Sequence, residues 1–153
     1  MFRRDRKRGF SLIELLIVIA IILIIASIAL PKLGEARKAA YEMAAIKALS
    51  TINTAQVQYF STYGRFAQTL QELGPPPGGG SKGPAAAGLI QDSLATGLHS
   101  GYTFTMVGMP SGYSVNADPQ SEATGNRHFY TDHNNVVRQN LEDSASETDP
   151  EIQ

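Results

Sequence analysis

Residues 10–31 read FSLIELLIVIAIILIIASIALP, an almost entirely apolar run with one carboxylate, Glu14, and a proline at its end, Pro31. At about 1.5 Å per residue, a helix over residues 10–30 is roughly 31 Å long, which is close to the hydrocarbon thickness of a bilayer. The run is therefore long enough for one membrane span. Glu14 needs its own explanation, because a charged side chain at the centre of a span costs about 2.5–3.5 kcal/mol and less near its end.

The segment before this run is strongly basic. Residues 1–9, MFRRDRKRG, contain five basic side chains against a single acid, Asp5. The positive-inside rule keeps such a segment in the cytoplasm and exports the chain that follows. Three basic residues, Lys32, Arg37 and Lys38, lie beyond the apolar run, but the five basic residues of the leader outnumber them. We therefore expect a single-pass precursor with a cytoplasmic leader.

The composition of the remaining chain limits what it can do. Residues 10–153 have eight basic and thirteen acidic side chains, a net charge of −5, so no nucleic-acid-binding patch is predicted. The chain has no cysteine, which excludes disulfides and thiolate chemistry. About 120 residues rich in glycine and proline follow the run, which suits one small domain with a modest core.

Two ordinary explanations of the run leave features unexplained. A cleaved secretory signal has an apolar core of 7–15 residues, but this core is longer, contains Glu14 and has no clear A-x-A site before Pro31. A plain membrane anchor explains the length. It explains neither Glu14 nor the junction between Gly9 and Phe10.

A third explanation accounts for all of these features together. The string KRGFSLIELLIVIAIILIIASIALP, residues 7–31, resembles the amino-terminal segment of type IV pilins and type II secretion pseudopilins. The resemblance implies that a prepilin peptidase cuts between Gly9 and Phe10, removes the leader (residues 1–9) and methylates the new amino group of Phe10. It also gives Glu14 a role in subunit assembly and makes Pro31 a helix-weakening proline.

The physical chemistry agrees with that implication for Glu14. The cut creates an α-amino group on Phe10, and such groups have an ordinary pKa of about 7.7–8.0, so a cation forms beside the carboxylate. Opposite charges attract strongly in a medium of low dielectric constant, and each relieves the desolvation of the other. In the family the pair is thought to set the register of an incoming subunit. The alternative is a carboxylate that stays protonated or reaches the membrane interface.

Residues 32–63 are predicted to extend the helix as an amphipathic segment. Steps of three, four and seven place one set of side chains on a single face, which we expect to be core: Ala45, Leu49, Ile52, Tyr59, Phe60 and Tyr63. We expect Lys38, Glu42 and Lys47 at more exposed positions. Gly64 is a suitable end for this helix.

Residues 64–98 are predicted to be an irregular loop region with short helical turns. Thr69 and Glu72 have capping-box spacing, which predicts one turn that ends at Gly74. The sequence GPPPGGGSKGPAAAG, residues 74–88, is unsuited to helix or strand. Residues 89–97 are consistent with another helical turn.

Residues 99–141 change to the alternating pattern of strands. Apolar and polar residues alternate over 102–107 and 113–117, and two further strands flank the turn at 132–135. We expect a three- to four-stranded antiparallel sheet whose inner face covers the helix stripe. Residues 142–153 are acidic, and we expect a flexible, solvated tail. The predicted fold is therefore α+β and pilin-like.

No catalytic constellation is recognisable, so an enzyme is not expected. His99, His128 and His133 lack the spacing of metal ligands. Major pseudopilins hold calcium in their carboxyl-terminal region. In this chain the acidic side chains that could supply oxygen ligands there are Asp118, Glu122 and Asp132. Calcium requires 6–8 oxygen ligands. These acids match no calcium motif, so we expect polar loop residues, and neither a metal nor a cofactor.

The resemblance implies a structural subunit of a type IV pilus or a related filament, a helical homopolymer. Its implied partners are prepilin peptidase, an inner-membrane assembly platform and a separate ATPase, because the chain has no P-loop of its own. The implied location is the bacterial inner membrane for the precursor and an extracellular filament for the mature subunit. The alternatives are a type II secretion pseudopilin, a minor pilin, and a membrane-anchored binding domain that never polymerises.

Overall fold

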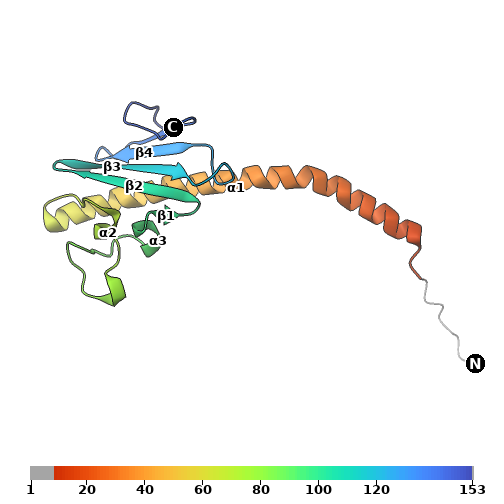
Figure 1. Cartoon of the computed structure of the whole chain (residues 1–153), viewed down its shortest axis with the longest axis horizontal. Coiled ribbons are helices and arrows are strands. Elements are labelled where there is room, and N and C mark those ends of the chain that lie inside the picture. Colours follow the sequence, from red (N-terminus) through yellow and green to blue (C-terminus); the bar gives the residue numbers. More distant parts are fainter. Residues whose placement is uncertain (1–8, 153) are drawn as a thin grey trace, which may run out of the picture. The chain divides into compact units, whose positions relative to one another are not determined.

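The computed structural model describes residues 9–152, so residues 1–8 of the predicted leader lie outside the described part. The chain divides into two units, one that ends at Ala36 and one that begins at Arg37. Helix α1, Leu12–Tyr63, contributes residues to both units (Figure 1). The two units are described in turn.

The first unit contains the apolar part of α1. Its large side chains are exposed throughout, from Leu12 at 79% to Leu30 at 68%. Among the described residues, α1 is the one helix that is long and apolar enough to cross a membrane by length and composition. The helix continues through Pro31. Because proline has no N–H, the carbonyl of Ser27 lacks its usual helical donor there.

The second unit contains an antiparallel sheet whose strands are adjacent in chain order. The strands are β1 (Leu98–His99), β2 (Tyr102–Met109), β3 (Gly112–Pro119), β4 (His128–Asp132) and β5 (Val137–Asn140). The α+β prediction is confirmed, and the four predicted strands are present. Sequence reasoning missed β1, because this strand has only two residues, too few to show an alternating pattern.

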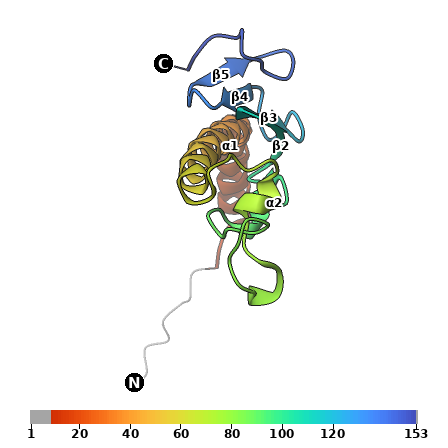
Figure 2. The ribbon, with the colours of Figure 1, turned by 90° about the vertical axis from the view of Figure 1, so that its left-hand side faces the viewer.

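The core of this unit lies between the sheet and the second half of α1, and Figure 2 shows the helix and the strands side by side. From the helix, Leu49, Ile52 and Tyr59 are fully buried. From the strands, every second residue points inward, as the strand period requires. The inward residues with the least exposure include Tyr102, Tyr113, Val115, Ala117 and Phe129.

Two positions on the helix differ from the predicted pattern. Phe60 was expected in the core but is 47% exposed, and its ring lies 4.8 Å from that of Phe66. Glu42 was expected at an exposed position but is only 8% exposed. Periodicity places a residue on a face, but it does not show how far the sheet extends over that face or which ion pair a loop supplies.

Buried polar side chains fix the helix against the rest of the unit. Gln56 is fully buried and binds both backbone groups of Ala67, accepting from its N–H at 2.9 Å and donating to its carbonyl at 3.0 Å. Asn53 donates to Thr131 on β4 at 2.9 Å and accepts from the Tyr113 hydroxyl on β3 at 3.0 Å. These bonds specify one position of the sheet on the helix.

The segment between α1 and β1 contains three short helical turns: α2 (Leu70–Leu73), the 3₁₀ turn η1 (Pro77–Gly79) and α3 (Asp92–Ala95). The Thr69 hydroxyl accepts from the N–H of Glu72 at the start of α2, as the capping-box spacing predicts. Gly74 follows the turn. Leu70 and Leu73 are buried against the core.

The acidic segment at the carboxyl end follows a defined path. We expected residues 142–153 to be a solvated tail, and Gln153 lies outside the described residues. Most side chains of 142–152 are exposed, but Ala145 is 3% exposed and the segment is hydrogen-bonded to the sheet. Composition indicated solvation correctly for most of the side chains. It could not show the bonds that sheet residues make to this backbone.

Candidate functional site

The predicted processing site lies in the extended residues before α1. Gly9 and Phe10 precede the helix and are exposed, with Phe10 at 83%. A Cβ atom placed on Gly9 would meet no other atom within 4 Å. The fold of this chain therefore does not itself require glycine at this position, and the Gly9–Phe10 peptide bond is accessible to another protein.

The predicted assembly residue, Glu14, lies in the first turn of α1. Its Oε2 atom accepts a hydrogen bond from the backbone N–H of Ser11 at 3.0 Å. The Ser11 carbonyl in turn accepts from the N–H of Leu15 at 3.2 Å, which makes Ser11 the residue that caps the helix. Ser11 and Glu14 thus form one half of a capping box.

Sequence reasoning missed Ser11, although the signal was present. The order Ser11-Leu12-Ile13-Glu14 has the same S/T-x-x-E spacing that identified the turn at Thr69 and Glu72. The prediction for Glu14 rested instead on the cost of a charge inside an apolar segment. The structure therefore brings Glu14 together with the residue that follows Phe10.

This arrangement suits a carboxylate that meets a new amino terminus. A cut after Gly9 would place the amino group of Phe10 one residue before the backbone N–H that Glu14 already binds. The positive end of the helix dipole lies at the same place and favours a negative charge. Pro31, the other predicted residue of this segment, lies 17 residues from Glu14, about 25 Å along the helix. The structure does not bring these two together.

The acids considered as calcium ligands lie in separate local contacts. Asp118 binds Nδ1 of His128 at 2.6 Å, and Asp132 accepts from the backbone N–H of Asn134 at 2.8 Å. Glu122 is exposed in the loop after β3. Within residues 9–152, no group of three or more His, Asp or Glu side chains is arranged to hold a metal ion.

The most buried carboxylate belongs to Glu42 on α1. It accepts from the backbone N–H of Asn126 at 3.0 Å and from Nε of Arg127 at 2.7 Å. Desolvation by burial alone raises the pKa of this carboxyl, but the bonds from Asn126 and Arg127 outweigh it and hold the pKa below its ordinary value. A charge that is held ionised and fully paired ties the β3–β4 loop to the helix and is not available for catalysis.

A second cluster joins α1 to the segment that follows it. The Tyr59 hydroxyl lies within hydrogen-bond distance of two acceptors, Oε2 of Glu72 at 3.0 Å and the carbonyl of Pro84 at 2.6 Å, which share its single proton. Arg65 binds the same carboxylate oxygen at 2.8 Å. Burial and the neighbouring carboxylate raise the pKa of Tyr59, so its hydroxyl remains a donor. This cluster therefore has a structural role, because it holds the segment after α1 against the helix.

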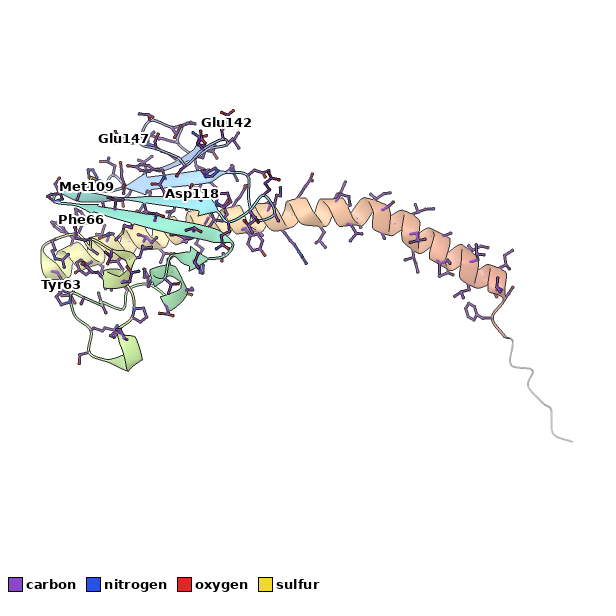
Figure 3. All side chains as sticks on the ribbon, in the orientation of Figure 1. Tyr63, Phe66, Met109, Asp118, Glu142 and Glu147 are labelled. Atoms are coloured by element: carbon purple, nitrogen blue, oxygen red, sulfur yellow. The ribbon has the colours of Figure 1, made fainter. Side chains whose placement is uncertain are left out.

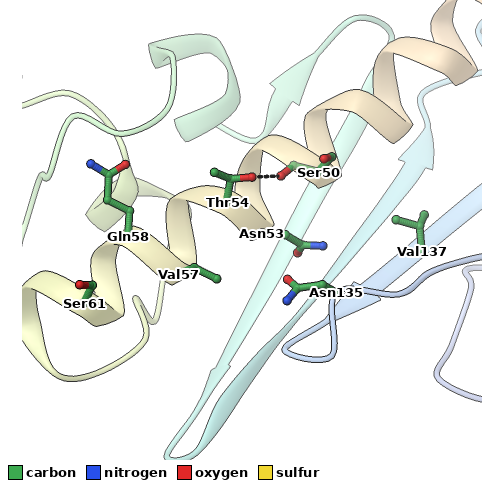
Figure 4. A pocket seen from close by; sticks show the side chains of 8 residues that line it. All are labelled: Ser50, Asn53, Thr54, Val57, Gln58, Ser61, Asn135 and Val137. Carbon is green, nitrogen blue, oxygen red and sulfur yellow. Dashed lines mark hydrogen bonds between the residues drawn. The ribbon is translucent and has the colours of Figure 1, made fainter.

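A groove of about 560 Å³ lies beside α1 in the second unit (Figure 4). Helix residues Ser50, Thr54 and Val57 line one side, and Asn135 and Val137 line the other. All eight lining side chains are uncharged. The groove therefore offers a surface for contact, and no lining acid or base is present to activate its serine and threonine hydroxyls.

Comparisons with known proteins agree with the features of the amino-terminal segment. Residues 4–30 match the family model for the prokaryotic N-terminal methylation motif. Over 77 residues the chain is 39% identical to the type IV major pilin protein PilA of Myxococcus xanthus, a match that covers 50% of this chain and 35% of that protein. No solved structure matches significantly. The resemblance of the amino-terminal segment to type IV pilins is confirmed.

Proposed function

We propose that this chain is a structural subunit of a type IV pilus or a related filament, cut between Gly9 and Phe10 and assembled through its apolar helix. One observation supports this proposal most strongly. Glu14 lies at the start of α1, bonded to Ser11, directly after an exposed Gly9–Phe10 junction. Neither a plain anchor nor a secretory signal has a use for that combination.

The exposed apolar half of α1 explains the two locations of such a subunit. Burial of apolar surface is worth about 25 cal/mol per Å², so a helix with every large side chain exposed must be covered. Lipid covers it in a single-pass precursor of the inner membrane, with the basic leader in the cytoplasm. Helices of neighbouring subunits cover it in an extracellular filament.

The charge pair gives this assembly its register. Neighbouring apolar helices slide past one another at little cost, because hydrophobic contact has no fixed direction. A buried carboxylate without a partner is costly, so an incoming helix is most stable where its Glu14 meets a Phe10 ammonium group. N-methylation of Phe10 leaves a secondary amine that still accepts a proton, so the cation is retained.

The proposed partners follow from the same chemistry. A peptidase must cut after Gly9, and a membrane-embedded platform must extract the subunit from lipid. The sequence has no P-loop, so the ATPase that drives extraction is a separate protein. The main partner of the mature subunit is another copy of itself.

Surface filaments sheared from cells that express the chain test the proposal. We expect this chain to be their principal protein, and deletion of its gene to remove them. A Gly9→Val variant should remain uncut in the membrane fraction, whereas Gly34→Val, which also meets no atom within 4 Å, should be cut normally. Recovery of the chain only from membranes, with filaments unchanged by its deletion, would contradict the proposal.

A further inference from the structure

The segment after β5 closes an edge of the sheet. We call residues 141–152 the strap. Near its end, the carbonyl of Pro150 accepts from the N–H of Gln139 at 3.0 Å, and the N–H of Ile152 donates to the carbonyl of Val137 at 3.0 Å. The strap thus occupies the backbone groups of β5 that an edge strand otherwise leaves open to other chains.

Side chains of β5 match the strap at alternate positions. Arg138 stands opposite Glu151 in an antiparallel bridge and bonds its carboxylate at 3.2 Å. Arg138 also donates to the carbonyl of Asp149 at 2.8 Å, and Asn140 donates to the Asp149 carboxylate at 3.1 Å. The partner that fits this edge is therefore an extended segment with carboxylates two residues apart, added to the sheet as a further strand.

The middle of the strap lies over the outer face of the sheet. Asn116 on β3 donates to the carbonyl of Ala145 at 2.6 Å. Figure 3 shows Glu142 and Glu147 on the strap and Asp118 on the strand below it. The bond from Asn116 therefore helps to fix the path by which the strap returns to the edge of β5.

The strap is held with little apolar burial. Ala145 is 3% exposed and Ile152 is partly buried, but most of the other side chains of the strap are exposed. Segments with few buried apolar contacts open locally at a smaller cost in free energy than the core does. The strap is thus the part of the sheet that can be released while β3, β4 and α1 stay folded.

The segment that fits the edge is present on every copy of the chain. The edge of one copy and the strap of another can form the same backbone bonds and the same Arg138–Glu151 contact that they form within one copy. The short connection gives a chain's own strap an effective concentration on the order of millimolar. The closed arrangement therefore predominates unless copies are densely packed.

We propose that the edge of β5 is a site for strand addition, closed by the strap of its own chain and open, once that strap is released, to the strap of a second copy. The strap thereby limits contact between the sheets of neighbouring copies. This role concerns the second unit alone and holds however α1 is covered.

Disulfide trapping in the full chain tests the proposal, because the chain has no cysteine of its own. Residues opposite one another in such a bridge have Cα atoms about 4.5 Å apart, within the range of about 4.4–6.8 Å that a disulfide spans. An Arg138→Cys chain and a size-tagged Glu151→Cys chain are mixed in detergent micelles and oxidised with copper phenanthroline. A non-reducing gel measures the mixed dimer. Arg138→Cys mixed with Glu147→Cys, at an exposed strap position outside the bridge, is the matched control.

We expect several-fold more mixed dimer from the bridge pair than from the control pair. Adding Asn116→Ala to the Arg138→Cys chain should raise the yield by about two- to twelve-fold, the factor that one lost hydrogen bond gives. Ser114→Ala, at the preceding outward position of β3, should leave the yield unchanged. In a single chain, the Arg138→Cys and Glu151→Cys substitutions together should give an internal disulfide and no dimer.

Hydrogen exchange of the Gln139 amide checks that Asn116→Ala loosens the strap. This amide should exchange faster in the variant, while exchange in α1 stays unchanged. Equal dimer yields from the bridge pair and the control pair would show random collision only and would overturn the proposal. A dimer yield or a Gln139 exchange rate that Asn116→Ala leaves unchanged would also overturn it. None of these measurements requires cleavage or filaments, so their failure is distinguishable from failure of the proposed function.

Discussion

The backbone N–H of Ser11 donates to the carboxylate of Glu14 at 3.0 Å, so the residue expected to act in assembly also caps the helix of the uncut chain. This bond gives the carboxylate a partner in the uncut chain, before the proposed cleavage would create the Phe10 ammonium group. It also separates two contributions of Glu14, a hydrogen-bond acceptor for the cap and a negative charge for the amino terminus. Substitutions can remove the charge alone or both contributions together.

Glu14→Gln should abolish filament assembly while cleavage after Gly9 continues. The glutamine carbonyl still accepts from the N–H of Ser11, so the cap survives, but no ion pair with Phe10 can form. Glu14→Ala, which removes both, should be no better in assembly than Glu14→Gln. Mature chain in membranes and filament yield are the two measurements, with Glu35→Gln as the control. Normal filaments from Glu14→Gln would show that the cap, and not the charge, is what matters.

Pro31→Ala should slow hydrogen exchange in the helix turn before it. Alanine restores the N–H that the carbonyl of Ser27 lacks, and it has a helix propensity about 3 kcal/mol more favourable than that of proline. Exchange of residues 24–30 in detergent micelles measures this effect. If filaments require local loosening here, this variant should also assemble less well. Unchanged exchange at these residues would show that Pro31 does not weaken the helix.

Sequence patterns predicted the helix and the sheet because both follow from periodicity. Leu49, Ile52 and Tyr59 are buried as their spacing requires, and Tyr113 and Val115 alternate as strand residues do. The patterns misplaced Phe60 and Glu42. Exposure at these positions depends on where the sheet edge ends and on the partner that Arg127 supplies from a loop 85 residues away in sequence.

Glu42→Gln should destabilise the second unit by about 1–3 kcal/mol at pH 7, because it weakens charge-assisted bonds to Asn126 and Arg127. The pKa of the Glu42 carboxyl in the folded chain lies below its ordinary value of 4.5, so the ionised group stabilises the fold above that pH. This contribution is lost as the pH falls below 4.5 through the folded value. Thermal unfolding followed by circular dichroism measures it.

The acid response of this variant provides the sharper comparison. The melting temperature of Glu42→Gln should fall less between pH 5 and 3 than that of the wild type, because the variant has no charge to lose at this site. Glu122→Gln, at an exposed position, should keep the wild-type response. Identical acid responses of Glu42→Gln and the wild type would contradict the assigned role.

Gln56→Leu should destabilise the second unit more than an exposed substitution does. Gln56 bonds both backbone groups of Ala67 in the core, and each group left without a partner costs about 1–3 kcal/mol. Gln58→Leu, at an exposed position two residues on, is the matched control. Denaturant unfolding of both variants gives the two free energies, and equal values would show that the Ala67 backbone finds other partners.

The pattern of the amino-terminal segment lies in one contiguous string. The roles proposed for Gly9, Phe10 and Glu14 rest on that string and on the match of residues 4–30 to the methylation-motif family. The sequence did not predict which polar side chains of the sheet bind residues 141–152. Asn116, Asp118 and Arg138 have ordinary strand positions, and their common target becomes visible only when the chain returns over the outer face of the sheet.

The intact mass of the mature chain isolated from cells tests the central claim most directly. Cleavage after Gly9 followed by methylation predicts a chain that begins with N-methyl-Phe10. Fragmentation of the amino-terminal peptide places the methyl group on the α-nitrogen of Phe10. A mature chain that begins at Met1, or at Phe2 after loss of Met1, would contradict the account.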